Sequence, residues 1–182
     1  MPTIQASHPV FAPIAVGCKK GKGFIYAPGV QVGNAITIST AEVFKEIPAF
    51  SGGGSVFKSA AVSVNTSSVP IQAYELMFGM EISGNILKDP PKVGVWGGFG
   101  YIEGNINMKC KYEVIVTWIK RVMFIPPPIS AVSRYNGNVT LTTPSFGGRA
   151  LSDGSRHWRE RYIFNTPDEA IKFLKFKAGI VE

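Results

Sequence analysis

The strongest constraint on this sequence is a stretch of period-two alternation near its middle. From Ile106 to Trp118, over thirteen residues, apolar side chains occupy every second position, and only Ile115 interrupts the polar positions between them. A strand with one buried and one solvated face produces this pattern. Strands average about 5–6 residues, so the stretch predicts one long strand or a strand bent into two.

Glycine and proline limit what can surround this strand. The chain has 182 residues, including 20 Gly and 13 Pro, with 45% apolar and 17% charged residues. At about 150 residues per domain, this length fits one globular domain. Frequent turns and few long helices predict an α+β fold. We expect a β-rich single domain with a twisted, mainly antiparallel sheet, one or two helices and an irregular N-terminal arm.

The predicted arm covers residues 1–54, and the predicted globular core covers 55–182. Five prolines punctuate the first segment, and the glycines at 52–54 predict a flexible hinge at its end. Within the arm, the alternation at 36–39 predicts a short strand. A short helix over 40–47, with Thr40 as its N-cap, is also compatible with the sequence.

Local signals place the elements of the core. The clearest helix start is Thr166-Pro167-Asp168-Glu169, which has an N-cap, a proline at the first helical position and the acid of a capping box, and Gly179 is a plausible stop. The other expected elements are a strand at 62–64, a helix rather than a strand at 71–82, a bulged strand at 92–101, a hairpin turn at 136–137, a strand at 139–142 and a loop at 146–155.

Positive charge is concentrated in the second half of the chain. The net charge is +7, and residues 92–182 carry thirteen basic and seven acidic residues, a net of +6. Such a field favours phosphate-bearing partners, either nucleic acid or anionic lipid. Two sets of basic residues are the candidate contacts, and for the arginine set the competing interpretation is a solvated loop paired with Asp153 and Glu160. The predicted contacts are Lys19, Lys20, Lys22, Arg149, Arg156, Arg159 and Arg161.

No set of residues with catalytic or metal-binding spacing is found in the sequence. Its two cysteines, Cys18 and Cys110, cannot form a disulfide framework, and no Cys/His spacing resembles a zinc site. His157 lies near Asp153 and Ser155, but a catalytic triad rarely lies within one five-residue loop. We therefore expect a non-enzymatic protein without cofactor or metal.

Apolar residues around the lysine cluster of the arm are the candidates for self-association. Phe11, Ile14 and Phe24 flank Lys19, Lys20 and Lys22. Such side chains either insert at an interface or dock on a neighbouring subunit.

The order of these pieces resembles the matrix proteins of rhabdoviruses, mainly over residues 55–182, and the short length suits a plant-infecting member. The resemblance rests on the Lys/Gly cluster at 19–23, the strand at 137–142, Trp158, Phe164-Asn165 and the terminal segment 178–182. Animal-virus members often carry Pro-Pro-x-Tyr in the arm, whereas the prolines at 126–128 are followed by Ile129-Ser130 here. Recruitment of host budding factors by that motif is therefore not implied.

The resemblance implies a non-enzymatic matrix protein that self-associates, condenses the nucleocapsid and binds the inner face of the viral envelope during assembly and budding. The implied partners are a second copy, the nucleoprotein–RNA nucleocapsid, an anionic membrane and the viral glycoprotein. The implied locations are the virion beneath its envelope and the host cytoplasm and intracellular membranes. Two alternatives stay open: a small jelly-roll viral coat protein, and a nucleic-acid-binding structural protein that does not assemble.

Overall fold

The computed structural model describes residues 4–15, 24–92, 94–106, 108–109, 111–127, 144–152 and 157–180. The strands within these residues are β1 (Ile4–Pro13), β2 (Val30–Gln31), β3 (Ala35–Ile47), β4 (Gly54–Thr66), β5 (Glu81–Ser83), β6 (Ile86–Lys88), β7 (Gly97–Ile106), β8 (Tyr112–Phe124), β9 (Ser145–Leu151) and β10 (Arg159–Phe164). The helices are the 3-10 turn η1 (Ala49–Ser51), α1 (Ile71–Phe78) and α2 (Pro167–Lys177). The predicted α+β class, with a β-rich single domain, is confirmed.

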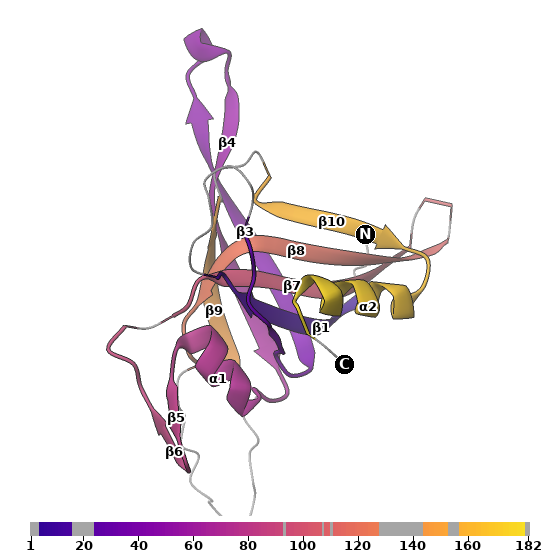
Figure 1. Cartoon of the computed structure of the whole chain (residues 1–182). Coiled ribbons are helices and arrows are strands. Elements are labelled where there is room, and N and C mark those ends of the chain that lie inside the picture. Colours follow the sequence, from indigo (N-terminus) through magenta and orange to yellow (C-terminus); the bar gives the residue numbers. More distant parts are fainter. Residues whose placement is uncertain are drawn as a thin grey trace, which may run out of the picture.

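One antiparallel sheet organises the described residues. Its strands follow the order β2-β1-β7-β8-β9-β4-β3. β10 also pairs with β8, beside the part of β8 that pairs with β9. The first half of β8 pairs with β10 and its last residues pair with β9, so the sheet divides at β8. Figure 1 shows the resulting twist, with β3 and β4 running across the direction of β7 and β8.

The two faces of the sheet build two apolar cores. Neighbouring residues of β1 point to opposite sides, as alternation requires: Phe11 packs with α1, whereas Val10 and Ala12 pack with α2. The α1 side contains a cluster of phenylalanines, in which Phe124 meets the rings of Phe11, Phe99 and Phe146 edge-on. The α2 side is built around Trp118 and Leu174.

The long alternating stretch spans a hairpin rather than one strand. β7 ends at Ile106 and β8 begins at Tyr112, and these two residues are paired across the hairpin. The structure therefore differs from both predicted forms, one long strand or a strand bent into two, because the stretch contains the end of one strand and the start of its antiparallel partner. Because paired residues lie on the same face of a sheet, the apolar pattern resumes in register after the connection, and the alternation by itself does not reveal the turn.

The predicted division into an arm over 1–54 and a core from 55 is wrong for the described residues. β1 is an inner strand between β2 and β7, and β3 pairs with β4 along its whole length. Two register shifts interrupt β1, one between Ile4 and Ser7 and one between Ser7 and Val10, and Pro9 lies within the second. Proline is tolerated in sheets at such irregularities. Of the described prolines in this segment, Pro9 lies at an irregular position of β1, Pro13 ends β1, Pro48 follows β3, and Pro28 lies in the connection before β2.

The strand predicted at 36–39 is part of β3, and the helix considered for 40–47 is wrong because β3 continues to Ile47. The glycines at 52–54 are not a hinge between domains. They have φ values of +98°, +64° and +114°, which favour glycine, and they close the tip of the β3–β4 hairpin. Figure 1 shows this hairpin projecting beyond the rest of the sheet.

The remaining predictions have mixed outcomes. The strand at 62–64 is confirmed in β4. The bulged strand predicted at 92–101 is confirmed only from Gly97, where β7 begins with a register shift between Gly97 and Phe99, and residues 94–96 are not in a strand. The helix at 71–82 is confirmed as far as Phe78, where Gly79 ends it with φ +72°. The C-terminal helix is confirmed, and Thr166 Oγ1 accepts a hydrogen bond from the Glu169 N–H at 3.4 Å. The loop at 146–155 is wrong at its start, since β9 runs to Leu151. Gly148 in β9 leaves room for the ring of Phe124, because a Cβ at Gly148 would lie 2.4 Å from Phe124 Cδ1. Residues 136–142 lie outside the described part.

Candidate functional site

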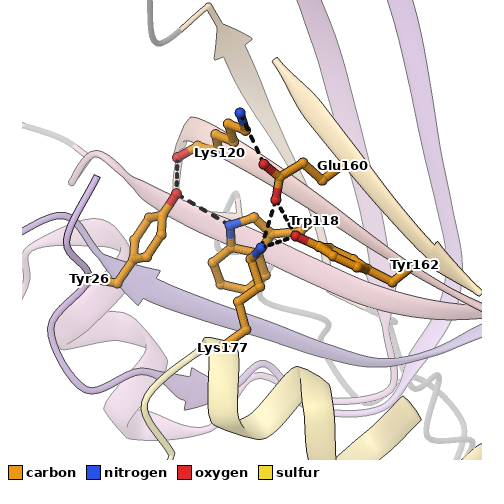
Figure 2. A network of polar contacts seen from close by, with 6 residues as sticks. All are labelled: Tyr26, Trp118, Lys120, Glu160, Tyr162 and Lys177. Atoms are coloured by element: carbon orange, nitrogen blue, oxygen red, sulfur yellow. Dashed lines mark hydrogen bonds and ion pairs between the residues drawn. The ribbon is translucent and has the colours of Figure 1, made fainter. Parts of the chain in front are cut away.

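An aromatic pocket lies on the α2 side of the sheet. It has a volume of about 480 Å³ and is formed by β8, β10, α2 and the segment that precedes β2. Figure 2 shows its polar side, where side chains from all of these elements converge. The pocket residues are Phe24, Tyr26, Trp118, Lys120, Glu160, Tyr162, Phe173, Phe176 and Lys177.

Trp118 forms the floor of this pocket, and glycines make room for it. A Cβ at Gly98 would lie 2.3 Å from Trp118 Cζ2, and one at Gly100 would lie 2.6 Å from Trp118 Cε3. Only glycine at these β7 positions lets the indole lie against the backbone. The Trp118 Nε1–H donates to the Tyr26 hydroxyl at 3.3 Å, and that hydroxyl donates to the Lys120 carbonyl at 2.9 Å. The buried indole is thereby hydrogen-bonded, as buried polar groups require.

Glu160 is the centre of a charged network at the edge of the pocket (Figure 2). Its carboxylate lies 3.1 Å from Lys120 Nζ and 2.7 Å from Lys177 Nζ, and it accepts a hydrogen bond from the Tyr162 hydroxyl. Partial burial alone raises the pKa of Glu160, but the hydrogen bonds from Lys177, Tyr162 and Lys120 outweigh it and lower the pKa to about 2. A carboxylate with so low a pKa is a poor proton acceptor at neutral pH. The network therefore suits binding and positioning better than proton transfer.

Lys177 is surrounded by aromatic rings as well as by oxygen atoms. Its Nζ lies 4.5 Å from the ring centre of Tyr162, 5.8 Å from that of Trp118 and 5.9 Å from that of Phe173. Ammonium groups are attracted to aromatic faces at these distances. Two lysines and one glutamate leave the pocket with a net charge of +1, and its walls are mainly aromatic carbon.

The second notable surface is the outer part of the β3–β4 hairpin, which we call the hairpin tip (residues 43–56). Four of its large apolar side chains are exposed: Phe50, at the very end, is 92% exposed, and Val43, Phe44 and Val56 are each about half exposed. Large apolar side chains gathered on a projecting element mark interaction sites.

Trp158 and Arg159 attach the base of this hairpin to the domain. The Trp158 ring stacks on Phe57 with centroids 4.4 Å apart and an interplanar angle of 2°. The Arg159 guanidinium lies 4.6 Å from the Trp158 ring centre, and its Nη2 lies 2.8 Å from Glu42 Oε1 on β3. These contacts hold the hairpin at a defined angle.

Arg159→Ala is expected to loosen the hairpin. The change removes a partly buried ion pair and a cation–π contact, so we expect a loss of about 1 kcal/mol in the free energy of unfolding. Faster hydrogen exchange at the β3–β4 amides would accompany it. Arg161→Ala, at an exposed position two residues along the same strand, is the matched control and should change stability by less than about 0.5 kcal/mol. Equal effects of the two variants would contradict the anchoring role.

The structure separates the predicted contact residues. Arg149 and Arg161 are exposed on β9 and β10, whereas Arg159 is engaged in the hairpin anchor; contact of these residues with a partner stays a prediction. Lys19, Lys20, Lys22 and Arg156 lie outside the described residues, as do Asp153 and Ser155 near His157.

The self-association prediction is wrong for Phe11, which is fully buried because the alternation of β1 points it into the α1-side core. Ile14 is half-buried and forms an isolated bridge with Tyr26. Phe24 lines the aromatic pocket.

Sequence reasoning missed the pocket and the hairpin tip. Tyr26, Trp118, Glu160 and Lys177 come from four separate segments, and no local motif joins them. The alternation did indicate that Trp118 shares a face with Val114 and Val116, but nothing in the sequence placed β10 beside β8.

Comparison with protein-family models and with curated proteins found no match for this chain. In the part of the chain that the structure describes, no helix is long and apolar enough to span a membrane, and no group of three or more His, Cys, Asp or Glu side chains is arranged to hold a metal ion.

Proposed function

We propose that this chain is a non-enzymatic structural protein of viral matrix type, which self-associates and binds anionic surfaces, namely membrane and nucleocapsid. The observation that carries the proposal is the hairpin tip. A projecting two-stranded element with Phe50 almost fully exposed has no evident role within its own domain, and association would remove its apolar surface from water.

Charge supports the second part of the proposal. The net of +6 over residues 92–182 provides a long-range attraction for phosphate groups. Arg149 and Arg161 are exposed within this half. The matrix-type assignment itself comes from the sequence resemblance, and with it come assembly beneath an envelope and the glycoprotein as a further partner.

The alternatives receive less support. A jelly roll packs two sheets against each other, whereas this sheet is covered by a helix on each face. A nucleic-acid-binding protein that does not assemble would leave the exposed apolar side chains of the hairpin tip without a binding role.

Vesicle flotation over a salt series tests the anionic-surface part. We expect the protein to float with anionic vesicles at low salt and to be released from them as salt screens the charges. We expect it not to float with neutral vesicles. Reversing the charge of Lys19, Lys20 and Lys22 together should weaken flotation, at about 1 kcal/mol per lysine. Lys88→Glu, which changes an exposed ion pair with Glu81, is the control. Failure to float with anionic vesicles at any salt concentration would contradict this part of the proposal.

A further inference from the structure

We infer that the hairpin tip of one copy docks, through Phe50, into the aromatic pocket of a second copy. The inference rests on the proposed self-association and names the two surfaces that meet. They are different patches of the same chain, so the contact is head-to-tail.

The conformation of the hairpin tip favours its insertion into a pocket. Gly52, Gly53 and Gly54 adopt positive φ and turn the chain tightly, which leaves the Phe50 side chain at the end of the hairpin and 92% exposed. β3 and β4 pair along their full length, and the stack on Trp158 fixes the base of the hairpin. A preorganised arm loses little conformational freedom when it binds, and this favours affinity.

The pocket is built to receive an aromatic side chain. Its volume of about 480 Å³ exceeds that of one phenylalanine side chain, and its walls are the rings of Phe24, Tyr26, Trp118 and Phe173. Phe176 at the rim is 82% exposed, so the pocket leaves apolar surface in water just as the tip does. Aromatic rings prefer edge-to-face or offset partners, which this lining offers.

Charge also allows the contact. The hairpin tip has no net charge, because Lys45 and Glu46 offset each other, and Glu46 is the nearer of the two to Phe50 in the sequence. The pocket holds Lys120 and Lys177 against Glu160, a net of +1. Because both lysines are already ordered by Glu160, an approaching carboxylate meets a fixed positive site without further ordering.

The tip cannot fill the pocket of its own chain. Figure 1 shows the hairpin pointing away from α2, which forms one wall of the pocket. A tip that fills the pocket must therefore belong to another copy. A head-to-tail contact leaves one tip and one pocket unused at the two ends, so it extends into rings or open arrays. Growth of this kind suits a protein that coats a large surface.

Sedimentation velocity on full-length variants tests the inference. Phe50→Ser removes the tip and Phe176→Ser weakens the pocket, and both positions are so exposed that the fold should be kept, which circular dichroism checks. We expect each change to raise the concentration for half-maximal association by about tenfold or more. Ile86→Ser, at a 60% exposed position on the separate β5–β6 hairpin, is the matched control and should associate like the unchanged chain.

Mixing the two variants gives the sharpest result. The Phe50→Ser chain keeps its pocket and the Phe176→Ser chain keeps its tip, so together they should form one contact and stop at a species of twice the monomer mass. Isologous pairing of the exposed β3 edge would instead leave both variants associating normally, and a tip that inserts into lipid would make Phe50→Ser lose flotation but not association. Either outcome overturns the inference while self-association stands. A monomeric unchanged chain would overturn the proposed self-association itself.

Discussion

Trp118→Ala is expected to lower the free energy of unfolding by about 3–5 kcal/mol, the range for a buried aromatic residue replaced by alanine. Trp118 is fully buried and is among the largest of the fully buried side chains in the described part of the chain. Its removal leaves a cavity that Gly98 and Gly100 cannot fill. It also leaves the Tyr26 hydroxyl without the indole N–H. Urea unfolding followed by circular dichroism measures the loss.

Trp96→Ala is the control for this prediction. Trp96 is half-buried, with the Arg121 guanidinium 4.5 Å from its ring centre, so its replacement should cost clearly less than that of Trp118. A loss below about 1 kcal/mol for Trp118→Ala would contradict the packing described for the α2 side of the sheet.

Glu160→Gln is expected to destabilise the fold at neutral pH by about 1–2 kcal/mol and to reduce the loss of stability in acid. In the folded chain the pKa of Glu160 is about 2, and a glutamate in an unfolded chain titrates at about 4.3. Because this pKa is lower in the folded chain, Glu160 contributes its full stabilisation at pH values above the unfolded-state pKa. This contribution to the free energy of unfolding disappears as the pH falls toward 2. We discount its size for solvent screening because 34% of the Glu160 side chain is exposed.

Unfolding free energies measured between pH 2 and pH 7 test this prediction. The curves of the unchanged chain and of Glu160→Gln should converge as the pH falls from about 5 to about 2. Glu81→Gln removes an exposed ion pair with Lys88 at 4.0 Å, and we expect it to change stability little at any pH. Parallel curves for the unchanged chain and Glu160→Gln would contradict the coupling of Glu160 to Lys120 and Lys177.

Local patterns in the sequence were sufficient for the α+β class and for elements whose signals are contiguous. The capping residues at Thr166 and Glu169 predicted the start of α2, and the alternation before Trp118 predicted a buried face of the sheet. These signals depend only on neighbouring residues, so they are independent of the tertiary fold.

Contacts between distant segments decided the features that the sequence did not predict. β1 became an inner strand because it pairs with β7, nearly a hundred residues away in the chain. Two of the prolines that suggested an arm lie in this strand, Pro9 at an irregular position and Pro13 at its end. The segment 146–155 was predicted to be a loop, yet its first part is β9, in which a Cβ at Gly148 would lie 2.4 Å from Phe124 Cδ1. The pocket required β10 to pair with β8 and α2 to cover both, and no local motif specifies that arrangement.

Sedimentation velocity of the unchanged chain over a concentration series, at low and at high salt, tests the proposed self-assembly most directly. We expect a monomer at low concentration and growth to large species as the concentration rises. Because aromatic burial drives the contact, part of this growth should persist at high salt. A single monomeric species at every protein and salt concentration would contradict the proposed self-assembly.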